Sequence, residues 1–200
     1  MAQQMSFFSA EARHPRVADL AGLLCGPGRT TTFARATAGL VVPIDAPWRM
    51  KALLRAYAER GVGAEAHTGD DGVTSLRTAF RVDLAPLAAA WGDGAAKAVP
   101  AGFVPDGAAL RMWVAAAGRW ADAAYLLPLD PDAPGTHEPL LFALAQCGLP
   151  ATMYRTDEVG PALRLIGGRR LGRLRELVGP PAGTGCAEQW PAVSRMRAVS

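Results

Sequence analysis

Hydrophobic and polar positions along this chain alternate with two periods, about 3.6 residues, which indicates helices, and two residues, which indicates strands. The helical and strand-like segments follow one order in the first half of the chain and the same order again in the second half. In each half the second helical stretch stops at a glycine, Gly61 or Gly148, which is typical of a left-handed helix end. The pattern therefore predicts the unit αββαββα, used twice.

The predicted elements of the two halves correspond one to one. In the first half they are a helix at 17–27, strands at 29–35 and 39–44, a helix at 47–60, strands at 62–68 and 74–82, and a helix at 84–91. In the second half they are a helix at 107–117, strands at 119–122 and 124–129, a helix at 136–147, strands at 150–156 and 161–166, and a helix at 168–178. We expect a mixed α/β (α+β) fold divided into an N-terminal extension (1–16), a first repeat (17–92), a linker (93–105), a second repeat (106–179) and a flexible tail (180–200).

An internal repeat supports this division. When the chain is shifted by 87 residues, 53–92 falls on 140–179 without a gap, and twelve of the forty aligned positions are identical. Among the identities are Arg77 and Arg164. A repeat of this length predicts two halves related by a pseudo-twofold axis within one monomer. Upstream, with small shifts in register, Pro43-Ile44-Asp45 corresponds to Pro128-Leu129-Asp130 and Gly28 to Gly118.

The first helix of each half resembles a known motif. The first copy, Leu20-Ala21-Gly22-Leu23-Leu24-Cys25-Gly26-Pro27-Gly28, is similar to the LAGLIDADG motif in its first four letters and its final glycine. The second copy, 110–118, is more degenerate and follows Lys97-Ala98-Val99-Pro100, which is similar to the Lys-x-x-Pro that often precedes the second motif. Together with the repeat and the order of elements, 17–179 resembles the LAGLIDADG homing-endonuclease family.

This resemblance implies an arrangement of helices and sheets. The two motif helices would pack side by side at the pseudo-twofold axis. The two four-stranded sheets would form a saddle whose concave face lies in the major groove of DNA. Small residues allow a close approach of two helices. The residues expected at that contact are Ala21, Gly22, Gly26 and Ala115–Ala117.

The acids on which cleavage depends in that family are absent from the motif. The last acid of each motif binds metal ions that activate water, and here Pro27 and Ala117 stand in its place. Cys25 and Ala115 stand at the other acid position, so neither copy offers a carboxylate oxygen to Mg²⁺. The nearest acids, Asp19 and Asp122, lie about two helical turns away or beyond the motif. We therefore expect a protein that is not an enzyme and needs no metal or other cofactor.

The LAGLIDADG-like domain of WhiA-type sporulation regulators is similar in lacking the nuclease acids. In those regulators a helix-turn-helix domain follows, whereas the Pro/Gly-rich segment 180–200 is too short for one. The departure argues against promoter binding of the helix-turn-helix kind. The resemblance implies a non-catalytic DNA-binding protein and, in the case of WhiA, a transcriptional regulator.

Composition is compatible with a DNA-binding role but does not establish one. Half of the residues are hydrophobic and 20% are charged, which is typical of globular domains, and the net charge is only +3. Only two of the 21 basic residues are Lys; Arg suits bidentate contacts to phosphate and guanine, although GC-rich coding bias gives the same composition. No apolar run could span a bilayer, and the N-terminal sequence lacks the order of a secretory signal, so we expect a cytoplasmic protein without membrane contact.

Alternation along the predicted strands indicates which side chains would face DNA. In 75–82, Leu76, Phe80 and Val82 are expected on the core face and Arg77 and Arg81 on the other. A solvated sheet face would carry the same residue types. The candidates for contact with double-stranded DNA are Arg29, Thr31, Arg35, His67, Arg77, Arg81, Arg119, Arg155 and Arg164.

Two other functions stay open at this point. The scaffold could have become a protein–protein interaction module, in which case the concave face should be apolar or neutral rather than lined by Arg. An enzyme with unfamiliar chemistry would need a cluster of carboxylates or histidines in a cleft. The three His and three Cys residues have no metal-ligand spacing, and no nucleophile triad or phosphate-binding glycine loop is present.

Overall fold

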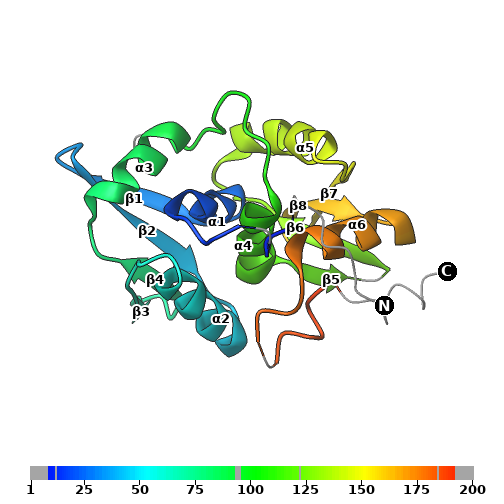
Figure 1. Cartoon of the computed structure of the whole chain (residues 1–200), viewed down its shortest axis with the longest axis horizontal. Helices are drawn as coiled ribbons and strands as arrows, with labels where there is room; N and C mark the ends of the chain where they lie inside the picture. The colour runs from blue at the N-terminus through cyan, green and yellow to red at the C-terminus, as the bar shows by residue number, and fades with distance from the viewer. Residues whose placement is uncertain (1–8, 12, 93–95, 122, 184, 192–200) are drawn as a thin grey trace.

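A computed structural model describes residues 9–191 apart from 12, 93–95, 122 and 184. It contains two four-stranded antiparallel sheets, one from each half, on either side of a central pair of helices (Figure 1). The strand order is β1-β2-β4-β3 in the first sheet and β5-β6-β8-β7 in the second, which is the same topology twice. The predicted fold of two αββαββα halves is therefore confirmed.

The observed elements lie within a few residues of the predicted ones. The first half contains α1 (Ala21–Cys25), β1 (Arg29–Phe33), β2 (Thr37–Pro43), α2 (Pro47–Ala58), β3 (Ala64–Thr68), β4 (Thr74–Thr78) and α3 (Ala85–Trp91). The second contains α4 (Gly107–Ala117), β5 (Arg119–Ala121), β6 (Ala124–Pro128), α5 (His137–Gln146), β7 (Thr152–Thr156), β8 (Gly160–Leu165) and α6 (Gly168–Val178). Short 3₁₀ helices, Val17–Leu20, Val82–Leu84 and Pro134–Thr136, precede α1, α3 and α5.

The central helices α1 and α4 pack against each other at very close range. A Cβ atom built on Gly22 would lie 1.8 Å from the carbonyl oxygen of Ala109 and 2.9 Å from Cβ of Met112. Only glycine therefore fits at this point of the contact. All five residues of α1 are buried, and in α4 Ala115–Ala117 are buried as well. The expected close approach of the two helices is present, with Gly22 against Ala109 and Met112 of α4.

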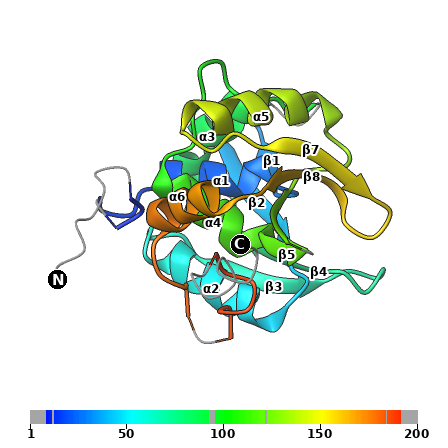
Figure 2. The same ribbon diagram turned by 90° about the vertical axis from the view of Figure 1, so that its right-hand side faces the viewer.

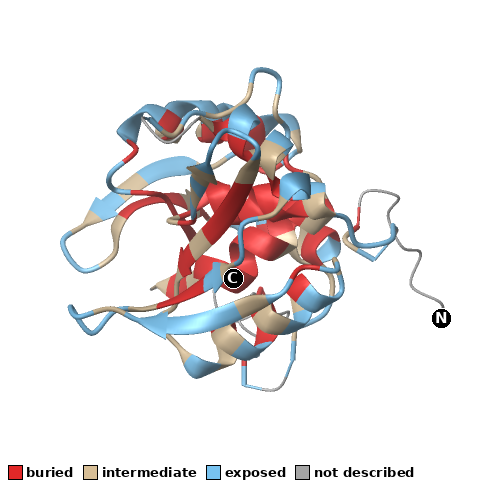
Figure 3. Ribbon diagram, turned by 90° about the vertical axis from the view of Figure 1, so that its left-hand side faces the viewer, coloured by how far each residue is buried: buried red, intermediate tan, exposed pale blue. Residues whose placement is uncertain are grey.

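The hydrophobic core surrounds this helix pair. Buried residues gather at the centre of the molecule, and the outer faces of the sheets and peripheral helices are exposed (Figure 3). Helices α2 and α6 both contact α4. The hairpins β3–β4 and β7–β8 extend from this centre toward the same side (Figure 2). In the inner strands β2, β4, β6 and β8 the core residues lie on one face only, so the other face of each sheet, called the open face below, points away from the central helices.

One irregularity in the first sheet changes the predicted direction of several side chains. Val42 pairs with Leu76, but Ala38 pairs with Arg81, so the β4 side contains one more residue than β2. An extra residue of this kind is a β-bulge, and it reverses the alternation beyond it. The expectation that Phe80 and Val82 lie on the core face is therefore wrong, since they are 54% and 72% exposed.

The C-terminal segment is not the flexible tail expected from its Pro/Gly content, as far as it is described. Trp190 is buried, and its indole nitrogen donates a hydrogen bond of 3.0 Å to the carbonyl oxygen of Gly179. The phenol of Tyr125 donates to the carbonyl of Gln189 at 2.9 Å. The described part of 180–191 thus packs on the second half, whereas 192–200 lie outside the described residues. Within the described chain every helix is too short or too polar to cross a bilayer.

Candidate nucleic-acid interface

A row of four side chains crosses the open face of the first sheet. The strand register places Arg29 beside Val41, Val41 beside Arg77, and Arg77 beside Glu65. Their neighbour Leu76 points the other way and is fully buried in the core. Both arginines and Glu65 are exposed, and Val41 is half-buried. The row therefore presents two guanidinium groups away from the core.

The second sheet carries a row of the same kind. Arg119 pairs with Leu126, Leu126 with Arg164, and Arg164 with Thr152. Leu163, the residue before Arg164, is buried in the core and fixes the direction of the row. Leu126 is buried too, but in a separate small apolar cluster on the open face. The order across this sheet is again arginine, apolar, arginine, polar.

The two rows occupy corresponding places in the two halves. Arg77 and Arg164 are related by the 87-residue repeat, while Arg29 and Arg119 directly follow the corresponding glycines Gly28 and Gly118. Since the two sheets also share one strand order, both pairs of arginines lie at matching positions of the two sheets. The repeat in the sequence therefore places equivalent arginines at equivalent positions on the open faces of the two sheets.

The two inner arginines, Arg77 on β4 and Arg164 on β8, each make one weak side-chain contact. Arg77 Nε donates a hydrogen bond of 3.2 Å to Ser75 Oγ. The guanidinium carbon of Arg164 lies 5.6 Å from the ring centroid of Tyr154, within the range of a cation–π contact. Neither has an ion-pair partner among the described residues. Arg77 is exposed and Arg164 half-buried, and the charge of each is left without a carboxylate partner among these residues.

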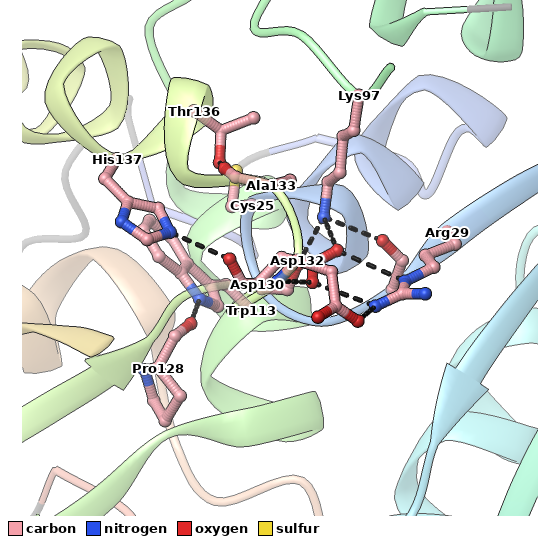
Figure 4. A network of polar contacts seen from close by, with 12 residues as sticks. Cys25, Arg29, Lys97, Trp113, Pro128, Asp130, Asp132, Ala133, Thr136 and His137 are labelled. Atoms are coloured by element: carbon pink, nitrogen blue, oxygen red, sulfur yellow. Dashed lines mark hydrogen bonds and ion pairs between the residues drawn. The ribbon is translucent and has the colours of Figure 1, made fainter. Parts of the chain in front are cut away.

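The two edge arginines instead form ion pairs that cross between the halves. Arg29 Nη2 lies 3.1 Å from Asp130 Oδ1, and Arg119 Nη2 lies 3.0 Å from Asp45 Oδ2. Asp45 and Asp130 are themselves repeat equivalents. The two ion pairs are therefore reciprocal: the arginine of each half contacts the aspartate of the other half. Arg29 also pairs with Asp132, and the convergence of charges on Asp130 is visible in Figure 4. These pairs connect the two halves of the chain.

Two further cations close the C-terminal ends of the central helices. Lys97 Nζ donates to the carbonyl oxygen of Gly28 at 2.8 Å, just beyond α1. Arg49 Nη2 donates to the carbonyl of Gly118 at 2.8 Å, and Nη1 to that of Ala115 at 3.0 Å, at the end of α4. The last carbonyls of a helix have no partner within it and carry partial negative charge, which favours a cation there.

The charge of Asp130 depends on these cations. Its side chain is 1% exposed. Burial alone would raise the pKa of Asp130, but Lys97, whose Nζ lies 3.2 Å from Oδ2, and the hydrogen-bonded Arg29 outweigh burial. The pKa of Asp130 is consequently lower than the ordinary carboxyl value, and the group is a carboxylate at neutral pH.

This arrangement does not fit the metal ions that the motif helices bind in homing endonucleases. Each carboxylate oxygen of Asp130 accepts two hydrogen bonds. Oδ1 accepts from Arg29 Nη2 and from the backbone nitrogen of Asp132, and Oδ2 accepts from Arg29 Nε and Lys97 Nζ. Cys25, at one acid position of the motif, is fully buried, and burial raises the pKa of its thiol, so it is not a thiolate ligand. The ends of the helices are occupied by the protein's own cations, which would repel a divalent ion.

The remaining candidate residues from the sequence divide into two groups. Thr31 and His67 are exposed on the open face of the first sheet: Thr31 follows Arg29 on one face of β1, and His67 pairs with Ser75. The other three do not join them. Arg35 lies in the β1–β2 turn with a positive φ of 57°, and Arg81 forms an ion pair with Asp83 next to the bulge. Arg155 pairs with Pro161 on the side of β7 opposite to the row that contains Arg164.

Sequence reasoning missed the acids near the helix ends. It considered Asp19 and Asp122, the nearest along the chain; Asp19 is buried in an ion pair with Arg60, and Asp122 lies outside the described residues. The fold instead brings Asp45 and Asp130 to the boundary between the halves. A signal for them existed, because both belong to the repeated Pro-x-Asp at the end of β2 and β6.

No protein-family model matches the sequence, and no curated protein matches it significantly. Solved structures do match the fold. One is the homing endonuclease I-WcaI bound to its DNA recognition sequence, with a TM-score of 0.57 and 13% identity, covering 88% of this chain and 83% of the other. Another is the N-terminal LAGLIDADG domain of DUF199/WhiA, with a TM-score of 0.52 and 11% identity, covering 90% and 87%. At these identities the comparisons show that the chain has the LAGLIDADG homing-endonuclease-like fold.

Proposed function

We propose that this chain binds double-stranded DNA through the open faces of its two sheets, without cleaving it, and that it acts as a regulator. The observation that carries the proposal is the pair of corresponding rows, with Arg77 exposed, Arg164 half-buried and neither in an ion pair among the described residues. A two-stranded β-ribbon fits the major groove, and arginine contacts both phosphate and guanine there. The matching structure of I-WcaI is bound to its DNA, which supports this use of the fold.

The symmetry of the rows predicts equal contributions from both sheets. A synthetic duplex labelled with a fluorophore would be titrated with the protein at two salt concentrations, and affinity read from anisotropy. Each lost phosphate contact should lower the salt slope by about one, and each lost base contact should weaken binding by about 1–3 kcal/mol. Arg77→Ala and Arg164→Ala should therefore weaken binding comparably, and the double variant should bind more weakly than either.

The matched control for this experiment is Arg55→Ala. Arg55 lies on α2, is 74% exposed, and its ion pair with Glu59 is on a helix surface, where such pairs contribute little. This variant loses the same charge away from the open face, so DNA affinity should stay close to that of the wild type. Absence of salt-sensitive binding in the wild type, or a double variant that binds as tightly as Arg55→Ala, would contradict the proposal.

The non-catalytic part of the proposal rests on the occupied helix ends. A hydrolytic metal site needs free carboxylate oxygens, and those of Asp130 and Asp45 are already engaged by cations. Supercoiled plasmid incubated with the protein and Mg²⁺ or Mn²⁺ should stay intact. Nicking that co-purifies with the protein and disappears in Asp130→Asn would show that the site is catalytic after all.

A protein partner is the second candidate, and one observation favours it. The open face of the second sheet contains a small apolar cluster of Ala124, Leu126 and Ala162, with Tyr154 and Ile166 packed against it. This face is less polar than that of the first sheet. If DNA binding fails in the titration above, a partner that packs on the partly exposed Tyr154 and Ile166 at the rim of this cluster becomes the better explanation of the fold.

A further inference from the structure

Two phenyl rings stand exposed at the end of the first sheet. Phe33 is 67% exposed and Phe80 54% exposed, although side chains of this kind are usually buried. Their ring centroids are 5.9 Å apart and the rings are tilted by 53°, so the two form one contiguous apolar surface. We call this surface the aromatic pair. Nothing in the core or in the proposed arginine contacts requires it.

The position of the aromatic pair is fixed by the backbone. Phe33 is the last residue of β1 and follows Arg29 and Thr31 on the exposed side of that strand. Phe80 reaches the same side because of the bulge between β2 and β4, which paired hydrogen bonds of 2.9 Å between Ala38 and Arg81 hold in place. The pair therefore continues the open face rather than lying on a separate surface.

Among its described residues, the second half has no counterpart of the aromatic pair. In the 87-residue repeat, the residue equivalent to Phe80 is Gly167. The strand that corresponds to β1, β5, has three residues instead of five, so its hairpin is shorter and ends before a position equivalent to Phe33. The aromatic pair thus breaks the symmetry that the arginine rows obey.

The surroundings of the pair favour DNA over an apolar protein surface. Thr31 on the same strand and Arg35 in the adjoining turn are exposed, and Arg29 lies on the same side four residues before Phe33. Residues on one face of a strand are about 6.6–6.8 Å apart, which is close to two base-pair steps of about 3.4 Å. A face that meets the major groove along β1 would therefore bring Arg29, Thr31 and Phe33 to base edges about two steps apart.

We propose that the aromatic pair contacts thymine methyl groups at one outer end of the DNA site. In the major groove the C5-methyl group is the apolar feature that distinguishes thymine, and Phe is among the side chains that contact it. The inference rests on the proposed function and adds to it a base preference and an asymmetry. One half-site should carry thymine at its outer positions, and the other should not.

The test removes single methyl groups from DNA. A preferred duplex would first be selected from a random pool with the full chain, and each thymine would then be replaced by uracil, one position at a time. Loss of one buried methyl should weaken binding about fourfold, which corresponds to about 0.8 kcal/mol. We expect this loss at one or two outer positions of a single half-site.

Protein variants then connect the effect to the pair. In Phe33→Ala and Phe80→Ala the thymine and uracil duplexes should bind equally at those positions. Phe142→Ala is the matched control, because Phe142 is 59% exposed on α5, outside both sheets, and its loss should leave the fourfold difference intact. Thermal melting of each variant establishes that these exposed substitutions leave the fold unchanged.

The outcomes separate this inference from the proposed function. No salt-sensitive binding to any duplex would overturn the proposed function itself. Binding that is insensitive to uracil at every position, or a uracil effect that survives in both Phe33→Ala and Phe80→Ala, would overturn the inference alone. A protein partner whose capture needs both phenyl rings, with DNA affinity independent of them, would also overturn it.

Discussion

Replacing Gly22 by Ala tests whether the contact between α1 and α4 sets the geometry of the molecule. In an ordinary helix this substitution stabilises by about 1 kcal/mol, because alanine has the higher helix propensity. Here the new Cβ would lie 1.8 Å from the carbonyl oxygen of Ala109, whereas real contacts do not fall below 3.0 Å. The helices would have to separate by about 1.2 Å, the difference between these distances.

The cost of this separation exceeds the gain in propensity. Forcing extra volume into a packed core costs about 1–3 kcal/mol, and the upper end applies because the obstacle is backbone that cannot rotate away. About 3 kcal/mol lost and about 1 kcal/mol gained leave a net destabilisation of about 2 kcal/mol. For a domain of this size that lowers the melting temperature by about 4–8 °C.

Urea unfolding of the wild type and two variants measures the effect. Gly172→Ala is the matched control: Gly172 lies within α6, and a Cβ added there has nothing within 4 Å. We expect the control to be stabilised by about 1 kcal/mol, so that the two variants differ by about 3 kcal/mol. If Gly22→Ala is as stable as Gly172→Ala, the close approach of the central helices is not what the structure indicates.

Three further predictions concern buried polar and aromatic groups. Arg49→Met should lower the free energy of unfolding by about 3–5 kcal/mol, because the carbonyls of Ala115 and Gly118 and the carboxylate of Asp45 lose their buried partner; an unchanged urea midpoint would contradict this role. The contribution of Asp130, whose pKa is depressed in the folded state, should be complete above the ordinary carboxyl pKa of 3.8 and be lost as pH falls below it. The melting temperature of the wild type should therefore fall more between about pH 6 and about pH 3 than that of Asp130→Asn, and parallel curves would refute the coupling. Trp190→Ala should destabilise by about 3–5 kcal/mol if the segment after α6 belongs to the core, and a shift below about 1 kcal/mol in urea unfolding would restore the view of a flexible tail.

Periodicity was sufficient to predict the elements, and the repeat was sufficient to pair the inner arginines. Leu76 and Leu163 are buried, and successive residues of a strand point to opposite faces. The direction of Arg77 and Arg164, which directly follow them, could therefore be predicted from local sequence. The bulge could not be predicted in this way. An extra residue exists only relative to the partner strand, and nothing in 74–82 alone shows that Arg81 rather than Phe80 pairs with Ala38.

The contacts that join the two halves were also beyond local reasoning. Arg29 and Asp130 are separated by 101 positions, and Arg119 and Asp45 by 74. The sequence predicts DNA contact for Arg29 and Arg119 and assigns no role to Asp45 and Asp130, and only the packing of the halves brings the four charges together. The tail shows a related limit, since its Pro and Gly content indicated a loop correctly but gave no information on where Trp190 would find a partner.

The reciprocal ion pairs have the form of an isologous interface, in which residue i of one subunit meets residue j of the other and j meets i. Here both copies of the contact belong to a single polypeptide. Two identical subunits joined in this manner read only palindromes, because any change in one is repeated in the other. A fused chain escapes that restriction: Phe33 and the longer β1–β2 hairpin exist in one half without being imposed on the other. On the proposed function, the molecule would combine the geometry of a dimer with the freedom to bind a DNA target that differs from its own reverse complement.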